Sequence, residues 1–174
     1  DKSNGSWFFL AEIYTDLDLP IDEPSINHCG TCHECIDVCP TQAIIAPYQL
    51  DARKCISYLT IENKESIPLH MRKSIGNRIF GCYDCQSFCP WNKFAKSAIN
   101  PDFKPKSNLL NQPLEILFLW SEKEWDKNTK GTALRRSGYK GWLRNIAVAL
   151  GNSETTPSIK KVLQSRLDGD SEMV

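Results

Sequence analysis

Eight cysteines carry the most specific chemical information in the sequence, because their spacing is that of iron–sulfur proteins. The first run reads C-x2-C-x2-C-x3-C-P and contains Cys29, Cys32, Cys35 and Cys39-Pro40. In bacterial ferredoxins such a run gives three thiolates to one 4Fe-4S cube, and its fourth thiolate reaches across to the other cube. The run therefore predicts at least one cube and indicates a second.

A second run repeats this pattern with one position changed. Ile79 stands where the first cysteine is expected, and the run continues with Cys82, Cys85 and Cys89-Pro90. A cube at this run would lack one ligand, and Cys55 is the one cysteine left to supply it. The sequence thus predicts two cubes that together use all eight thiolates.

In ferredoxins the last cysteine of each run binds the cube that is otherwise held by the other run, and this rule predicts the two ligand sets. We name the two predicted cubes cluster one, held by Cys29, Cys32, Cys35 and Cys89, and cluster two, held by Cys39, Cys55, Cys82 and Cys85.

Other uses of paired cysteines fit this chain less well. Disulfide frameworks are typical of short secreted chains with little core, whereas this chain has 174 residues, of which 41% are hydrophobic. A structural zinc site takes two C-x2-C pairs per ion, and the longer run matches cluster chemistry better. His28 and His33 flank the first run, but four thiolates per cube are already present, so both are expected at the surface.

Short elements must present these cysteines. A proline after the last cysteine of each run is expected to end the helix that carries the thiolates. Residues 41–45 and 50–55, with a turn near Pro47, predict a hairpin that leads into Cys55, and residues 56–81 form an insert that splits the second run. The apolar segment 6–13 is expected either to cover the cluster core or to pack against an upstream part of the protein.

The last third of the chain predicts helices. Pro113 begins an apolar-periodic helix that is followed by a polar stretch, a clearer helix runs over 142–150 and ends at Gly151, and a third begins at Pro157. Successive amphipathic helices resemble the start of a HEAT-type solenoid.

The predicted fold class is therefore α+β, mainly α. We expect a bacterial two-cluster ferredoxin-like domain over 1–99, a linker over 100–112, and a truncated HEAT-like helical segment over 113–174. Because Met71 and Met173 are the only methionines, Asp1 is not expected to be a translation start, and the chain is expected to be a piece of a longer protein.

Charge is distributed unevenly along the chain. Eight acidic residues oppose Lys2 alone over 1–37, whereas 127–152 contains no acidic residue and six basic ones. The basic run is either a solvated helical face or a surface for a polyanion. The chain has no run of about 18 apolar residues and no basic-then-apolar leader, which predicts a soluble cytoplasmic protein without a membrane span.

The sequence resembles the epoxyqueuosine reductase family in several strings: C-G-T-C-H-E-C at 29–35, C-I-S-Y-L-T-I-E at 55–62, I-G-N-R-I-F-G-C at 75–82, C-P-W-N at 89–92 and L-R-N-I-A at 143–147. The split second run combined with these strings is more specific than the ferredoxin spacing alone. Tyr83 departs from the resemblance, since an acidic residue is expected there.

The resemblance implies an enzyme that uses cobalamin to reduce epoxyqueuosine to queuosine in tRNA, with two 4Fe-4S clusters as its electron relay. It places cobalamin and the catalytic acid mainly in a domain upstream of Asp1, so no catalytic residue is assigned and this chain alone is expected to be inactive. A monomer that binds tRNA and an external electron donor is expected.

The expected contacts follow from the same resemblance. Tyr58, Arg72 and Arg78 are expected to contact cobalamin from the insert, although the insert could instead contact the anticodon arm of the tRNA or form only a covering loop. The basic run is expected to contact tRNA phosphates through Arg135, Arg136, Lys140 and Arg144.

Other classes of function remain open on the residues alone. A plain ferredoxin-like carrier would need only the cysteines, but it leaves the basic tail unexplained. A nucleic-acid-binding protein with structural clusters would use the tail without redox cycling. A reductive-dehalogenase-like enzyme would also join cobalamin to two cubes, and a substrate assay would separate it from the reductase.

Overall fold

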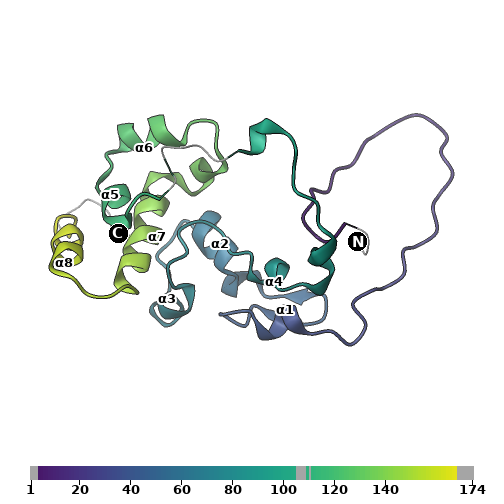
Figure 1. Cartoon of the computed structure of the whole chain (residues 1–174), viewed down its shortest axis with the longest axis horizontal. Coiled ribbons are helices and arrows are strands. Elements are labelled where there is room, and N and C mark those ends of the chain that lie inside the picture. Colours follow the sequence, from purple (N-terminus) through teal and green to yellow (C-terminus); the bar gives the residue numbers. More distant parts are fainter. Residues whose placement is uncertain (1–3, 105–108, 110, 168–174) are drawn as a thin grey trace.

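Two groups of elements lie side by side in the computed structural model, which describes residues 4–104, 109 and 111–167. One group contains the cysteine runs, and the other contains the helices of the tail. Between them lie α2 (Ile56–Ile61) and α3 (Leu69–Ile75), the two helices of the insert (Figure 1). Within the described residues, no helix is long and apolar enough to cross a membrane.

The cysteine runs are presented by very short elements. Helices α1 (Glu34–Asp37) and α4 (Asp84–Ser87) pack against each other. The predicted hairpin is confirmed: β1 (Ile44–Ala46) pairs antiparallel with β2 (Gln49–Leu50). The single-turn helix η1 (Ala52–Lys54) then leads into Cys55.

The prolines of the two runs act differently from what the sequence predicts. Both α1 and α4 end two residues before the Cys-Pro pair, at Asp37 and Ser87, so proline does not itself end either helix. Pro90 instead occupies the first position of η2 (Pro90–Phe94), where its missing N–H is not needed.

The tail consists of α5 (Leu114–Leu119), α6 (Glu122–Thr129), η4 (Ala133–Ser137), α7 (Gly138–Gly151) and α8 (Pro157–Gln164). The three predicted helices are confirmed as α5, α7 and α8. Helix α6 lies in the stretch described as polar, and a capping box between Ser121 and Glu124 is the signal that marks its start. The HEAT-type solenoid stays a prediction.

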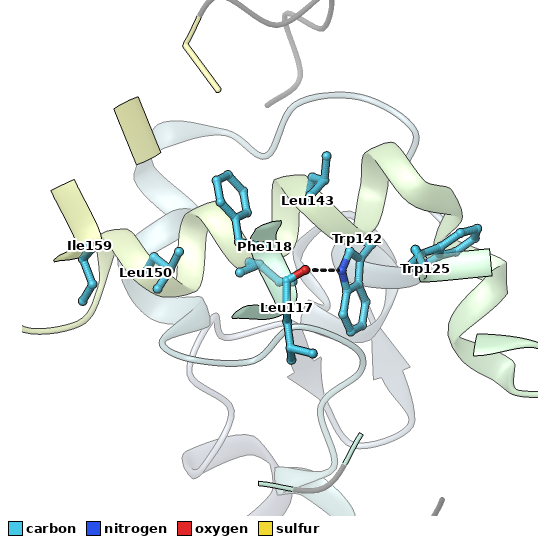
Figure 2. Packing of buried hydrophobic residues seen from close by; sticks show 8 residues of the cluster. Leu117, Phe118, Trp125, Trp142, Leu143, Leu150 and Ile159 are labelled. Atoms are coloured by element: carbon cyan, nitrogen blue, oxygen red, sulfur yellow. Dashed lines mark hydrogen bonds between the residues drawn. The ribbon is translucent and has the colours of Figure 1, made fainter. Parts of the chain in front are cut away.

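Figure 2 shows the core of the tail, in which aromatic and aliphatic side chains of α5, α6, α7 and α8 interdigitate. Trp142 is 1% exposed, and its indole N–H donates to the Leu117 carbonyl at 3.3 Å. The buried members of this core are Leu117, Phe118, Trp125, Trp142, Leu143, Ile146, Leu150 and Ile159.

A second core joins the insert to the tail. Val148 of α7 packs among the insert residues Ile56, Leu59, Ile67, Met71 and Ile75. Helix α7 therefore contributes to both cores. Because of this, the predicted boundary near residue 99 does not separate two independent cores.

The N-terminal arm is extended and mostly exposed, and it loops away from the other elements (Figure 1). The ring of Trp7 packs against that of Tyr83 in a tilted arrangement, with ring centroids 5.6 Å apart. Beyond it, Phe9, Leu10 and Ile13 are 92%, 89% and 91% exposed, so the arm covers the cluster region at Trp7 but not along the rest of the predicted segment. In the predicted linker, η3 (Pro101–Phe103) is described, while residues 105–108 and 110 lie outside the described residues.

A buried arginine connects the tail to the insert. Arg144 is 2% exposed and donates to the carbonyl oxygens of Leu59, Asn63 and Glu65 at 2.6–2.8 Å. These carbonyls lie at and beyond the C-terminal end of α2, where helix carbonyls lack partners and a cation is favourable. The guanidinium also bonds the Asn145 side-chain oxygen.

Replacing Arg144 by Met should destabilise the fold by about 3 kcal/mol or more, because several buried acceptors lose their donors at once. Chemical denaturation monitored by circular dichroism measures the loss. Lys140→Met, at an exposed position of the same helix, is the control and should change the stability by less than about 0.5 kcal/mol. Equal stability of the two variants would contradict the connecting role of Arg144.

Candidate iron–sulfur site

The two cysteine runs adopt nearly the same backbone. The residue before α1, His33, has φ −131° and ψ 14°, and the residue before α4, Tyr83, has φ −123° and ψ 13°. In each run the last cysteine donates its N–H to a carbonyl three residues earlier. The sequence repeat is therefore also a structural repeat, although the second run lacks its first cysteine.

Ile79 contacts the helices of the tail. Its side chain packs, partly buried, against the core of the tail, and its carbonyl accepts from the Asn145 amide at 2.9 Å. The backbone at residue 79 is therefore held against α7. Cys55, which directly precedes α2, lines the same cavity as the second run.

A cavity of about 450 Å³ gathers five of the eight thiols. Its walls include the apolar side chains of Ile44, Leu50 and Ile56. The cysteines that line it are Cys35, Cys39, Cys55, Cys82 and Cys85. Four of them are the predicted ligands of cluster two.

A second cavity, of about 580 Å³, lies next to the first cysteine of the first run. Cys29 and Cys89, which are far apart in sequence, both line it, together with His28 and Trp91. The rings of His28 and Trp91 are 5.9 Å apart, and the Trp91 indole N–H donates to the His28 carbonyl at 3.2 Å. Two predicted ligands of cluster one therefore meet at this cavity.

The electrostatic neighbours of the thiols form two groups that share Cys35. Burial raises the pKa of Cys35, and the negative charges of Cys29, Cys32 and Cys89 raise it further. Burial likewise raises the pKa of Cys85, with additional contributions from the cysteines around it: Cys82, Cys55, Cys35 and Cys39. Positively charged iron would relieve the repulsion within each group.

Cys39 differs from these thiols. Burial would raise its pKa, but N–H donors from Ala43, Ile44 and Thr41 outweigh burial and hold the pKa below its ordinary value. The Ala43 N–H lies 3.2 Å from the sulfur. Hydrogen bonds to sulfur are one of the means by which a protein sets a cluster's potential.

The arrangement suits a cluster better than a single ion. All eight cysteines are free thiols. Among the described residues, no three His, Cys, Asp or Glu side chains converge on one metal-ion position. Each thiolate of a cube binds a different iron, so a cube can take thiolates from several sides of one cavity.

Ser57 holds one of the thiol-bearing residues in place. Its hydroxyl donates to the Cys82 carbonyl at 3.0 Å and accepts from the Cys82 N–H at 2.9 Å. Thr60, one turn further along α2, accepts from the Gly81 N–H at 2.9 Å. Sequence reasoning did not single out Ser57, whose role depends on a contact across 25 residues.

The residues expected to contact cobalamin lie in different surroundings. Tyr58 is 40% exposed. Arg72 donates to the Ile67 carbonyl at 2.9 Å, and Arg78 pairs with Asp84 at 2.6 Å. The two arginines thus support the insert and the start of α4.

Three of the four basic residues expected to contact tRNA lie at the surface. Arg135 pairs with Asp126 at 2.6 Å, Arg136 pairs with Glu62 at 2.7 Å, and Lys140 is exposed. A turn separates these residues at Gly138, where η4 meets α7 with φ 74°.

Arg144 was expected to contact phosphate, and this expectation is wrong. The side chain is buried and its guanidinium is bonded to the carbonyls of the insert, so no phosphate can reach it. Lys64 of the insert joins the basic surface instead, because its Nζ donates to the Arg136 carbonyl at 2.8 Å. Lys64 and Lys140 both line a groove of about 330 Å³.

Comparison with known proteins identifies the class of the cysteine region. Residues 28–92 match the family model of the 4Fe-4S double cluster binding domain. The chain therefore contains a domain that binds two 4Fe-4S clusters.

Similar proteins are known over the full length of the chain. The chain is 58% identical over its full length to an epoxyqueuosine reductase of Xanthomonas campestris pv. campestris, of which it covers 49%. It matches the structure of epoxyqueuosine reductase from Streptococcus thermophilus with a TM-score of 0.72 and 28% identity, over 90% of this chain and 41% of that one. An epoxyqueuosine reductase with an epoxyqueuosine-modified stem loop of tRNA-Tyr matches with a TM-score of 0.70 and 31% identity, over 82% of this chain and 42% of that one.

The chain is thus similar over its full length to epoxyqueuosine reductases, and it spans about half the length of the curated relatives it matches.

Replacing Ser57 by Ala should weaken the binding of iron in cluster two, because the partly buried N–H and carbonyl of Cys82 lose the hydroxyl that bonds both. Release of iron to a chelator should become severalfold faster for about half of the bound iron. Ser87→Ala, at an exposed position of α4, is the matched control and should release iron like the wild type. Unchanged release from the Ser57 variant would exclude this role.

Proposed function

We propose that this chain is the electron-relay part of an epoxyqueuosine reductase that reduces epoxyqueuosine to queuosine in tRNA. The observation that carries the proposal is the match of the whole chain to about half of such enzymes, in a chain whose thiols line two neighbouring cavities. The relay accepts electrons from an external donor, and the protein acts as a cytoplasmic monomer.

The proposed ligand sets follow the crossed pattern. Cluster one takes Cys29, Cys32, Cys35 and Cys89, and cluster two takes Cys39, Cys55, Cys82 and Cys85. Two observations support this division: Cys29 and Cys89 line one cavity, and all four ligands of cluster two line the other. Cys35 also borders the cavity of cluster two, so the two clusters are neighbours.

Two clusters suit a relay but not the complete reaction. A cluster passes single electrons, whereas removing an epoxide oxygen requires two electrons and protons. Cobalamin, held mainly by the other half of the protein, supplies the two-electron chemistry. The role of this chain is to hold the two clusters close together. The apolar side chains of Ile44, Leu50 and Ile56 shield them from water.

Tyr58 is the strongest of the proposed cobalamin contacts. It is the exposed member of the set, on the helix that Cys55 precedes. The guanidinium groups of Arg72 and Arg78 already donate hydrogen bonds to backbone carbonyls of this chain, so they are less free to bind a cofactor. Their contribution is therefore to position α3 and α4 beside the cofactor.

The proposed tRNA surface consists of Arg135, Arg136 and Lys140, with Lys64 added from the insert. Glu62 and Asp126 hold the two arginines at the surface without burying them, since Arg136 keeps 68% of its side chain exposed. A relative whose structure contains a modified tRNA stem loop supports this part of the proposal.

Replacing Cys55 by Ala in the full-length protein should remove cluster two and leave cluster one. Iron and sulfide content should fall toward half, and reduction of epoxyqueuosine in tRNA should stop while tRNA binding persists. Elemental analysis, paramagnetic resonance and a turnover assay give the three readouts. Retention of both clusters or of turnover would contradict the proposed relay.

The double variant Cys55→Ala with Ile79→Cys is a sharper control. It restores the uninterrupted ferredoxin spacing, but position 79 is drawn into the core of the tail. We therefore expect the lost cluster not to return. Its return would mean that Cys55 is dispensable.

Lys140 offers the cleanest test of the tRNA surface, because in the described part of the chain it forms no ion pair. Lys140→Ala should weaken binding to all tRNAs alike and reduce the slope of log affinity against log salt by about 0.7 to 0.9. Lys160→Ala, an exposed lysine of α8, is the matched control and should leave the slope unchanged. Equal slopes for all proteins would show that the basic run is only a solvated face.

A further inference from the structure

Tyr48 has a backbone conformation that its side chain disfavours. It follows Pro47 in the turn of the hairpin and has φ 62°. Proline at the second position of a turn and a positive φ at the third are typical of a type II turn, where glycine or asparagine normally supplies the positive φ. A bulky residue there is strained, and such strain persists where another interaction or a function compensates for it.

Core packing does not compensate for this strain. The Tyr48 side chain is 76% exposed. Its hydroxyl donates to the side-chain oxygen of Asn27 at 2.5 Å, and the same oxygen accepts the backbone N–H of Cys29 at 2.9 Å. Tyr48 therefore connects the turn of the hairpin to the first thiol-bearing residue of cluster one.

Tyr48 also lies between the two cavities that the cysteines line. It lines the cavity of cluster two together with Cys39 and Cys55, and it lines the second cavity together with Cys29 and Cys89. Among the residues that the structure describes, it is the one that these two cavities share. The ring thus borders both cluster sites, while the hydroxyl acts on one of them.

We propose that Tyr48 is a positioning residue for the electron relay: its ring forms a wall common to both clusters, and its hydroxyl fixes Asn27 and, through it, the backbone of Cys29. The ring limits the access of water to both clusters, and solvent exposure is one of the factors that set a cluster's reduction potential. The hydroxyl acts only on cluster one. This inference rests on the proposed binding of two clusters.

Two substitutions separate the roles of the ring and the hydroxyl. Tyr48→Phe keeps the ring and removes the hydrogen bond to Asn27, so the potential of cluster one should shift while that of cluster two stays the same. Tyr48→Gly removes the ring and relieves the backbone strain. In that variant both potentials should shift, and both clusters should bleach severalfold faster in air.

The measurements use the full-length protein with its clusters, in redox titrations followed by paramagnetic resonance. The same titration in the Cys55→Ala background isolates cluster one. Tyr83→Gly is the matched control, because Tyr83 is an exposed tyrosine that lines only the cavity of cluster two, so cluster one should be unaffected.

Stability of the full-length protein with its clusters, measured without air, separates this role from a purely structural one. Because Tyr48→Gly relieves strain, its midpoint of unfolding should equal or exceed that of the wild type, even though its clusters become more sensitive. A lower midpoint with unchanged potentials and bleaching would overturn the inference. Failure of the wild type to bind two clusters would instead overturn the proposed function, so the two failures are distinguishable.

Discussion

The burial of Arg144 constrains the whole arrangement, because a guanidinium removed from water must find acceptors for its N–H groups. It finds them at the C-terminal end of α2, and Asn145 beside it bonds the carbonyls of Thr60 and Ile79. Burial lowers the pKa of Arg144, but arginine keeps its charge in proteins, so the acceptors are required at every accessible pH. The tail and the insert can therefore not shift independently.

This constraint reaches the cluster region through the insert. The helix whose end is held by Arg144 begins next to Cys55, and its Ser57 and Thr60 bond the backbone of Cys82 and Gly81. Two ligands of the proposed cluster two are thus positioned by a helix fixed from the tail. The insert connects the two parts of the molecule, and its loss would affect the clusters even though it contains no cysteine between Cys55 and Cys82.

The sequence predicts the local features of this molecule well and the long-range ones poorly. The cysteine spacing predicts the repeated turns around α1 and α4, and apolar periodicity predicts α5, α7 and α8, because both signals lie within a few neighbouring residues. Spacing alone could not show that Arg144 is buried, since charge normally indicates a solvated face, and its acceptors lie about 80 residues earlier. The same reason explains why Lys64 and Ser57 were missed: each acts on a residue distant in sequence.

The two halves of the structure differ in what stabilises them. The helices of the insert and tail surround two apolar cores, whereas α1 and α4 contain no buried residue, and Cys29 and Cys32 are exposed. A region with so little buried apolar surface gains little from the hydrophobic effect, so thiolate–iron bonds must supply much of its stability. The helical half holds Cys55 and Cys82 before any metal binds. Protein contacts alone therefore fix part of the ligand set of the proposed cluster two. The first run is held by fewer contacts, at Cys29 and Cys39, and depends more on the metal for its order.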